Sequence, residues 1–238
     1  MKTIGLIGGM SWASTIEYYR ILNQTAHARL GGLHSAKVLL YSVDFQEIEP
    51  AMREDRWADA ARILVDAARR LEAGGADLLL LCTNTLHKVA GEIERATRLP
   101  FLHIADACGE AIVARKLKKV GLLGTRFTME QDFISSRLER RFNLEVLAPD
   151  AAQRESANRI IFEELVHGRI LPQSKADYLE IIRGLTGRGA EGIILGCTEI
   201  GLLIQQADVA VPVFDTTLIH ALAAMDLALA GEPVAAKH

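Results

Sequence analysis

The chain has 238 residues, of which 50% are apolar and 24% are charged, and its formal net charge is −3. This size and apolar content suffice for a large core in one domain or two smaller ones. The well-mixed charges form no basic stripe of the kind that nucleic-acid binding needs, and no apolar run reaches the length of a membrane span. Three cysteines without a CxxC pair suggest neither a disulfide framework nor a zinc site, so we expect a reduced, cytoplasmic protein.

Short apolar runs alternate with longer amphipathic segments along the chain. In chain order, the pattern predicts strand 3–9, helix 13–30, strand 36–44, helix 55–75, strand 76–82, helix 85–97, strand 99–104, helix 111–120, strand 120–125, helix 128–142, strand 144–149, helices near 153–167 and 173–187, strands 191–197 and 211–215, and a last helix ending near 229. In the first helix we expect Ile16, Tyr19, Leu22 and Asn23 or Ala26 along one side. Continuous apolar strands that alternate with helices are typical of parallel sheets covered on both faces.

Three segments recur in the same order in the two halves of the chain. IGLIGG (4–9) matches VGLLGT (120–125), GADLLLLCT (75–83) matches GAEGIILGC (189–197), and LPFLHIAD (99–106) matches VPVFDTTL (211–218). Their common order and nearly constant separation favour a duplicated α/β lobe over coincidence.

We therefore predict an α/β fold of two Rossmann-like lobes with parallel sheets, related by a pseudo-two-fold axis. The N-terminal lobe is expected to comprise residues 1–98 plus 216–238, and the C-terminal lobe residues 103–211. Ligands bind at the carboxyl ends of parallel strands, so we expect the active site in the cleft between the lobes. In the alignment of the halves, Cys197 falls opposite Thr83 and Cys82 falls opposite Gly196.

The aligned Thr83 and Cys197 suggest chemistry on one carbon, because one proton-transferring group on each face permits stereochemical inversion. A thiolate is a competent base once its pKa is lowered, as helix N-termini can do. In the turns that follow the strands, Asn84, Thr85 and Thr198 can donate hydrogen bonds to a substrate carboxylate, and Glu199 is expected to receive an ammonium group. The alternative is that small residues end both strands only to let helices pack closely.

Other residues near these segments have more than one interpretation. The glycines of LIGGMSW form either a tight turn or a carboxylate cradle; they match neither GxGxxG nor a P-loop, so no dinucleotide is implied. His87 lies either on a solvated helix face or as a donor toward the site. Cys108, within a helical pattern, is expected to serve packing alone.

The sequence resembles the Asp/Glu racemase family, the cofactor-independent amino-acid racemases. The resemblance is carried by IGLIGGMSW (4–12), CTNTLHKVA (82–90), LGTRFTMEQDF (123–133) and GCTEIGLL (196–203). Within the family it is similar to the bacterial L-aspartate/glutamate-specific subgroup. This resemblance implies an isomerase that acts on a small acidic amino acid without a cofactor or metal, does not bind nucleic acid or membranes, and forms a homodimer.

The family pattern has one Cys directly before Asn-Thr and a second Cys in Gly-Cys-Thr. Cys197 is the second, whereas Thr83 occupies the first position. Cys82 lies one residue earlier, and because side chains alternate along a strand it should face the opposite side. The resemblance implies that Thr83 and Cys197 are the catalytic pair, with the L enantiomer as the preferred substrate.

The resemblance also implies contacts to the rest of the substrate. It assigns Met10, Ser11 and Thr125 to the substrate site, and it favours Arg53, in the loop after the second strand, as the clamp for the distal carboxylate. Some relatives carry a lysine anchor in the segment matching 162–168, where this chain has Val166 or His167.

Two other classes of function stay open. The first is another enzyme of the same fold, namely a decarboxylase, a maleate isomerase or a hydantoin racemase. The second is a non-catalytic protein that binds an acidic amino acid. The composition also permits a pyridoxal enzyme that uses Lys88 as its Schiff-base residue.

Overall fold

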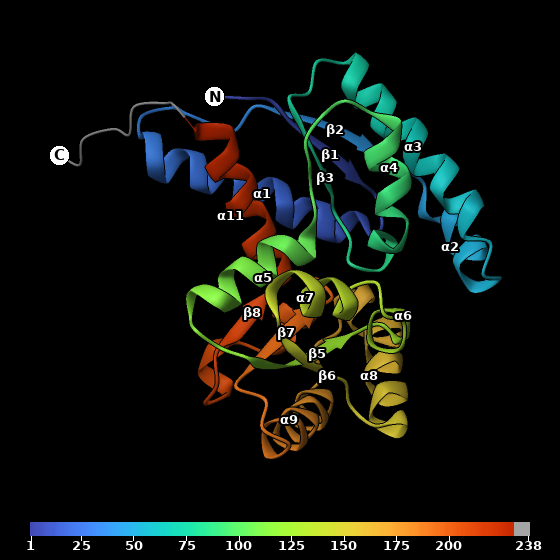
Figure 1. Ribbon diagram of the computed structural model, residues 1–238, viewed down its shortest axis with the longest axis vertical. Helices are drawn as coiled ribbons and strands as arrows, with labels where there is room; N and C mark the ends of the chain where they lie inside the picture. Colours follow the sequence, from blue (N-terminus) through green and yellow to red (C-terminus); the bar gives the residue numbers. More distant parts are fainter. Residues whose placement is uncertain (231–238) are drawn as a thin grey trace. The chain divides into compact units, whose positions relative to one another are not determined.

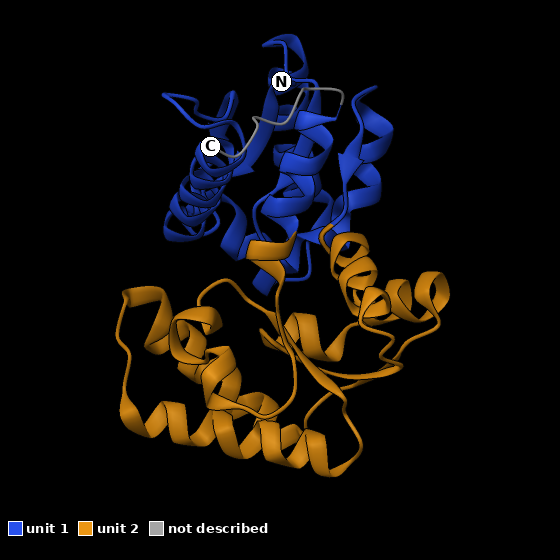
Figure 2. Ribbon diagram, turned by 90° about the vertical axis from the view of Figure 1, so that its left-hand side faces the viewer, with its two compact units in different colours: residues 1–103, 220–238 blue, residues 104–219 orange. Residues whose placement is uncertain are grey.

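The computed structural model describes residues 1–230, which divide into two compact units. Unit 1 contains residues 1–103 and the chain from residue 220 onward, and unit 2 contains residues 104–219 (Figure 2). Each unit holds a four-stranded parallel sheet with helices packed against it (Figure 1). The predicted α/β class with two parallel sheets is therefore confirmed.

Unit 1 is built on the strand order β2-β1-β3-β4. Its elements are β1 (Ile4–Gly8), α1 (Trp12–Leu30), β2 (Val38–Ser42), α2 (Phe45–Arg53), α3 (Trp57–Ala73), β3 (Leu78–Leu81), the 3₁₀ helix η1 (Thr85–Val89), α4 (Ala90–Ala96) and β4 (Phe101–Leu102). The final helix α11 (Thr216–Leu229) begins in unit 2 and continues into unit 1.

Helices cover both faces of the unit 1 sheet. On one face Leu6 and Leu80 pack with Tyr18 of α1 and Met225 of α11 in one apolar cluster. The intervening strand residues such as Leu81 point the other way, toward the side on which α3 contacts β1 and β2. Full burial of each such leucine stabilises the fold by about 1.5–3 kcal/mol, which explains why these strands are continuously apolar.

Unit 2 repeats the same plan with the strand order β6-β5-β7-β8. Its elements are α5 (Ile104–Ala114), β5 (Lys119–Gly124), α6 (Arg126–Glu130), α7 (Ser135–Phe142), β6 (Glu145–Leu147), α8 (Ala151–Glu163), η2 (Leu165–His167), α9 (Pro172–Gly187), β7 (Gly192–Gly196), α10 (Ile200–Leu203), η3 (Gln206–Asp208) and β8 (Val213–Asp215). In both units the first strand of the sheet lies between the next two strands along the chain: β1 lies between β2 and β3, and β5 lies between β6 and β7. This shared order is expected of a duplicated lobe.

Two apolar clusters fill the two faces of the unit 2 sheet. Leu195 lies in a cluster with Tyr178 and Ile181 of α9, whereas Ile194 lies in a cluster with Cys108 of α5 and Leu138 of α7. Adjacent residues of β7 thus enter opposite cores, the alternation expected of a strand.

Several predicted helices differ from the structure in their bounds. The segment 128–142 forms two helices, because Gln131 adopts extended backbone between α6 and α7. The helix expected at 111–120 begins at Ile104 and ends at Ala114. The sequence pattern gave no helix at α2, although Asp44 caps it by accepting a hydrogen bond from the backbone N–H of Gln46 at 3.0 Å.

The buried face predicted for the first helix was partly wrong. Ile16 and Tyr19 are 52% and 54% exposed, whereas Tyr18 and Leu22 are fully buried. Apolar residues lie on both sides of α1, so spacing alone does not identify its inner face. The Tyr18 hydroxyl, 2.8 Å from Nδ1 of His220, joins the buried face to α11. Within residues 1–230, no helix combines the length and apolar character that a membrane crossing needs.

Candidate active site

The strand register gives Thr83 and Cys197 equivalent positions within their own units. In unit 1 Ile7 pairs with Leu81, and Thr83 follows two residues later. In unit 2 Leu123 pairs with Leu195, and Cys197 follows two residues later. Each residue therefore lies just beyond the carboxyl end of the strand beside the first strand of its sheet, the edge at which such sheets bind ligands.

In unit 1 the turn between β1 and α1 carries Met10 and Ser11. Gly9 has a φ of 101°, and a Cβ at this position would lie 2.2 Å from the carbonyl oxygen of Val43, so only glycine fits. Ser11 caps α1 by accepting from the backbone N–H of Ser14 at 3.4 Å, and Met10 is buried. Because β1 and β3 are parallel neighbours, this turn lies at the same sheet edge as Thr83.

Thr83, Asn84 and Thr85 form a buried turn after β3 in unit 1, with exposed fractions of 9%, 5% and 5%. The preceding Cys82 is fully buried in the cluster with α1 and α11, and burial raises the pKa of its thiol. Cys82 is thus a packing residue, as its position on the opposite side of the strand predicted. A narrow, mostly buried turn suits the exclusion of water around a reacting group.

The structure overturns the interpretation of His87 as a residue on a solvated face. His87 is 3% exposed, and its Nδ1 lies 2.7 Å from the carbonyl oxygen of Thr83. A carbonyl oxygen only accepts, so Nδ1 carries the proton and donates to it. The His87 ring stacks edge-on against that of His103, with a centroid separation of 4.5 Å. The backbone of Thr83 is therefore held by a buried imidazole.

A second buried imidazole, His220 of α11, completes this cluster in unit 1. Its Nε2 lies 2.8 Å from the carbonyl oxygen of Leu102, and its Nδ1 lies 2.8 Å from the hydroxyl of Tyr18. Since Leu102 accepts from Nε2, the neutral ring accepts the Tyr18 proton at Nδ1. Burial lowers the pKa of His220 to about 4, so the ring is neutral at physiological pH. Sequence spacing gave no sign of this cluster, because its members lie far apart along the chain.

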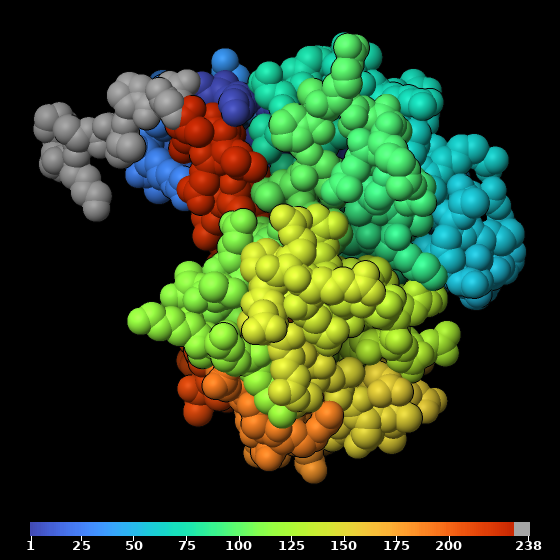
Figure 3. Space-filling model, viewed as in Figure 1, coloured from blue at the N-terminus to red at the C-terminus, as the bar shows by residue number. Residues whose placement is uncertain are grey.

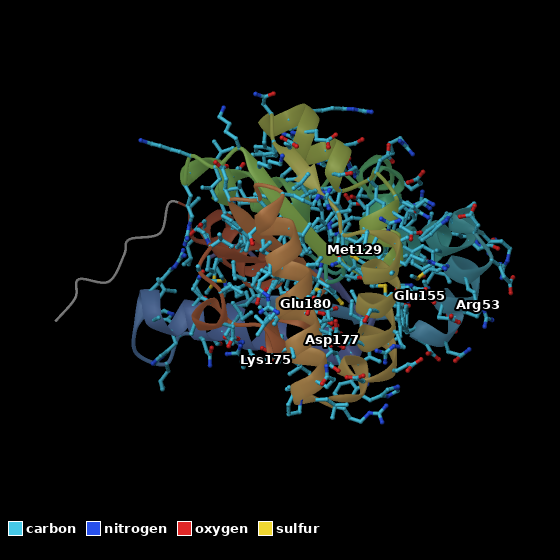
Figure 4. The ribbon with its side chains drawn as sticks, turned by 90° about the horizontal axis from the view of Figure 1, so that it is seen from below. Arg53, Met129, Glu155, Lys175, Asp177 and Glu180 are labelled. Atoms are coloured by element: carbon cyan, nitrogen blue, oxygen red, sulfur yellow. The ribbon has the colours of Figure 1, made fainter. Side chains whose placement is uncertain are left out.

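Arg53 lies at a different kind of position from the one expected. It is the last residue of α2 rather than part of a loop, and its side chain is exposed (Figure 4). The segment around α2 forms an outer edge of unit 1 (Figure 3). Lys88 of η1 contacts the residues that follow α2. Its Nζ lies 3.9 Å from the centre of the Trp57 ring and 3.6 Å from Oδ1 of Asp55. These contacts connect the loop after α2 to the turn that carries Thr83.

In unit 2 Thr125 and Cys197 follow neighbouring strands at one sheet edge. The Thr125 hydroxyl caps α6 by accepting from the backbone N–H of Thr128 at 3.3 Å. A Cβ on Gly124 would lie 2.8 Å from the carbonyl oxygen of Gly196, so the two strand ends approach closely. This close approach brings the backbones after β5 and β7 into one compact edge.

Cys197, Thr198 and Glu199 form a hydrogen-bonded set in unit 2 that differs from expectation. The Cys197 thiol and the Thr198 hydroxyl both donate to Oε2 of Glu199, at 2.9 Å and 2.6 Å. Burial and then the Glu199 carboxylate raise the pKa of Cys197, whereas a lowered value was expected from the following helix. Burial is the larger cause and the acid beside the sulfur adds to it, whereas the helix that follows, α10, has only four residues. The Glu199 oxygen expected to receive an ammonium group thus accepts two hydrogen bonds from side chains.

The other groups considered from the sequence have structural surroundings. Cys108 is buried in α5, and burial, followed by Asp215, raises the pKa of its thiol to about 12. Val166 packs partly against an apolar cluster and His167 is exposed, both in η2. Within the described part of the chain, no group of three or more His, Cys, Asp or Glu residues is arranged to hold a metal ion.

Comparison with known proteins identifies the family. Residues 7–224 match the model of the Asp/Glu/Hydantoin racemase family. The broad specificity amino-acid racemase RacX of Bacillus subtilis is 25% identical over 224 residues, covering 90% of this chain and 92% of RacX.

Solved structures agree with this match. A candidate Asp/Glu racemase from Yersinia pestis is 55% identical with a TM-score of 0.91, covering 96% of this chain and all of that one. An aspartate racemase homologue from Pyrococcus horikoshii OT3 is 38% identical with a TM-score of 0.85, covering 96% of this chain and 99% of that one. The chain therefore belongs to the Asp/Glu/Hydantoin racemase family and is an amino-acid racemase.

Proposed function

We propose that this racemase inverts the Cα of aspartate or glutamate by two-base proton transfer without a cofactor, with Thr83 and Cys197 as the proton-transferring pair. The observation that carries the proposal is their equivalence in the register: each follows the paired residues Leu81 or Leu195 by two positions. Two groups at equivalent strand ends of a duplicated fold suit a reaction that needs one group for each face of a carbon.

The pair is chemically unequal, and we propose that the enzyme is correspondingly asymmetric. A thiol is a far stronger acid than an aliphatic hydroxyl, so sulfur is the better base of the two. Cys197 then abstracts the proton efficiently from the enantiomer that presents it to sulfur, which we take to be L, and Thr83 serves the opposite face. Because the equilibrium constant of racemisation is one, kcat/KM is equal in both directions, and the asymmetry lies in kcat and KM separately.

The remaining assigned residues hold the substrate in this proposal. Donors at Ser11, Asn84 and Thr85 in unit 1, beside the buried Met10, bind the α-carboxylate, as does Thr125 of unit 2, whereas the hydroxyl proton of Thr198 goes to Glu199. Arg53 clamps the distal carboxylate through a charge-assisted pair, for which its exposure leaves it available. These donors stabilise the charge that develops when the Cα proton leaves.

Separate samples of L- and D-aspartate and L- and D-glutamate in heavy water test the proposal. Circular dichroism follows the decay of the signal of each enantiomer, and proton NMR follows deuterium entry at Cα. We expect both with wild type, and we expect Cys197→Ser to lose both by about 100-fold or more, the usual contribution of a positioned acid or base. Release of CO₂, or binding without deuterium entry, would instead indicate a decarboxylase or a binding protein.

A further inference from the structure

The side chain of Glu199 is directed to the reactive sulfur rather than to the backbone of its own turn. Its Oε2 accepts from Cys197 Sγ at 2.9 Å and from Thr198 Oγ1 at 2.6 Å. Two N–H groups of α10 have backbone acceptors, since Ile200 donates to the carbonyl oxygen of Cys197 and Leu202 to that of Glu199, and the Glu199 side chain makes no cap bond to the helix. The carboxylate is thus placed to interact with the thiol proton, and α10 does not need it as a cap.

Glu199 and Cys197 lie beside an apolar part of unit 2. Glu199 is 6% exposed, and Cys197 packs against the apolar cluster that contains Tyr178 of α9. A second carboxyl group, that of Glu164 at the end of α8, is 8% exposed, accepts from Ser174 and lies 3.6 Å from Arg159. Burial is the largest cause of the raised pKa of the Tyr178 hydroxyl, and this carboxylate adds to the rise, as does that of Glu199. The Tyr178 hydroxyl donates to the carbonyl oxygen of Ala157 at 3.1 Å. A second negative charge on sulfur would be costly here, because low-dielectric surroundings strengthen repulsion between like charges.

We propose that Glu199 is the proton acceptor for Cys197, so that the sulfur acts as a base without first becoming a free thiolate. This inference rests on the proposed function of Cys197. As a lone pair of sulfur takes the Cα proton, the original S–H bond breaks and its electrons stay on sulfur. The released proton bonds to Oε2 of Glu199, and the electrons of the Cα–H bond remain on carbon. The thiol is regenerated, Glu199 becomes neutral, and the negative charge moves from the carboxylate to the substrate.

The reverse step uses the same atoms. The neutral Glu199 returns its proton to sulfur while the thiol proton passes to Cα, so sulfur also acts as an acid without leaving a bare anion. At this face of the substrate, one negative charge therefore passes between the Glu199 carboxyl group and the substrate, and the thiol is neutral before and after the transfer. Thr198, which donates to the same oxygen at 2.6 Å, stabilises the ionised carboxylate between turnovers.

The variant Glu199→Gln tests the inference, because an amide keeps an acceptor oxygen but does not take up the proton. We expect kcat to fall by about 100-fold or more in both directions, with Glu199→Asp recovering part of the loss. Glu180→Gln is the control, since it removes an exposed carboxyl group on α9 of the same unit; its kcat should stay within about threefold of wild type.

A second readout distinguishes proton transfer from simple structural support. Alkylation of Cys197 by iodoacetamide, followed by mass spectrometry from pH 6 to 10, reports thiolate formation without turnover. Without the neighbouring carboxylate, the thiolate of Glu199→Gln should form more readily, and alkylation at pH 8 should be about tenfold faster, the change that one pKa unit gives. An inactive variant with a more reactive cysteine is the result expected.

Two outcomes overturn the inference, and a third overturns the proposed function beneath it. Glu199→Gln with wild-type kcat, while Cys197→Ala is inactive, excludes Glu199 as the acceptor. An inactive Glu199→Gln whose Cys197 reacts no faster than wild type indicates structural damage instead. Full racemisation by Cys197→Ala would remove both the inference and the assignment of Cys197.

Discussion

Nδ1 of His87 lies 2.7 Å from the carbonyl oxygen of Thr83, so a buried imidazole donates to the backbone of the residue assigned to proton transfer. The substitution His87→Leu keeps most of the volume but leaves that carbonyl oxygen without its donor. An unpaired buried acceptor costs about 1–3 kcal/mol, and we expect the free energy of unfolding to fall by that amount in urea titrations. His27→Leu, at an exposed position of α1, is the control and should change it by less than about 0.5 kcal/mol. Equal stability of the two variants would contradict the role given to His87.

The architecture of both sheets could be predicted from the sequence because it depends on local and repeated patterns. Continuous apolar strands and three repeated segments indicate a duplicated parallel fold, and the register aligns Thr83 with Cys197 as the repeat did. The face predicted for α1 failed because it depends on contacts between distant segments. The inner face of α1 packs in one apolar cluster with α11 and carries the bond from Tyr18 to His220, and no spacing rule contains that information.

The same limit applies to the candidate site. Residue types at strand ends were readable from the sequence, but side-chain directions were not. Glu199 was expected to receive a substrate ammonium group, yet its carboxylate accepts from Cys197 and Thr198, an orientation set by rotamers and by the short α10. The α2 helix was missed although Phe45, Ile48 and Met52 have helical spacing and Asp44 offered a cap; Pro50 within the segment is the residue that disfavours a helix.

The substitution Thr83→Cys should make the two directions of racemisation more alike. A second thiol gives both faces a group that acts as a base near neutral pH, whereas the threonine hydroxyl ionises with difficulty. We expect the ratio of kcat for the L enantiomer to kcat for the D enantiomer to move toward one by about tenfold, as measured by circular dichroism from each side. Thr83→Ser, which retains the hydroxyl, should keep the wild-type ratio. If Thr83→Cys impairs both enantiomers to the same extent, the asymmetry has another origin.

The exposed Arg53 should matter for acidic substrates in particular. Arg53→Met removes the cation at the end of α2, and a charge-assisted hydrogen bond contributes about 1.5–3 kcal/mol. We therefore expect KM for aspartate and glutamate to rise about 10–100-fold while kcat changes little. Arg69→Met, an exposed arginine on α3, supplies the control and should leave KM unchanged. An unaltered KM in Arg53→Met would assign the distal carboxylate to another residue.

His220 should make the fold less stable in mild acid. Burial lowers its pKa from 6.5 to about 4, so between these values the unfolded chain binds a proton that the folded chain does not. Stability is therefore unaffected above about pH 6.5 and declines as the pH falls toward 4, by at most about 3 kcal/mol. The groups that face this ring are the Tyr18 hydroxyl, the Leu102 carbonyl oxygen and the ring of His87, 5.9 Å away.

The variant His220→Gln isolates this effect from the titration of carboxylates, which both proteins share. Glutamine keeps hydrogen-bonding capacity toward Tyr18 and Leu102 but does not titrate, so its loss of stability between pH 7 and pH 4.5 should be smaller than that of wild type. His34→Gln, at an exposed loop position, should follow the wild-type curve. Urea midpoints at the two pH values measure the difference. Parallel curves for wild type and His220→Gln would mean that the buried ring gains its proton without a cost in stability. That outcome would contradict the structure, in which Nε2 of His220 donates to Leu102 and Nδ1 accepts from Tyr18 in a buried cluster.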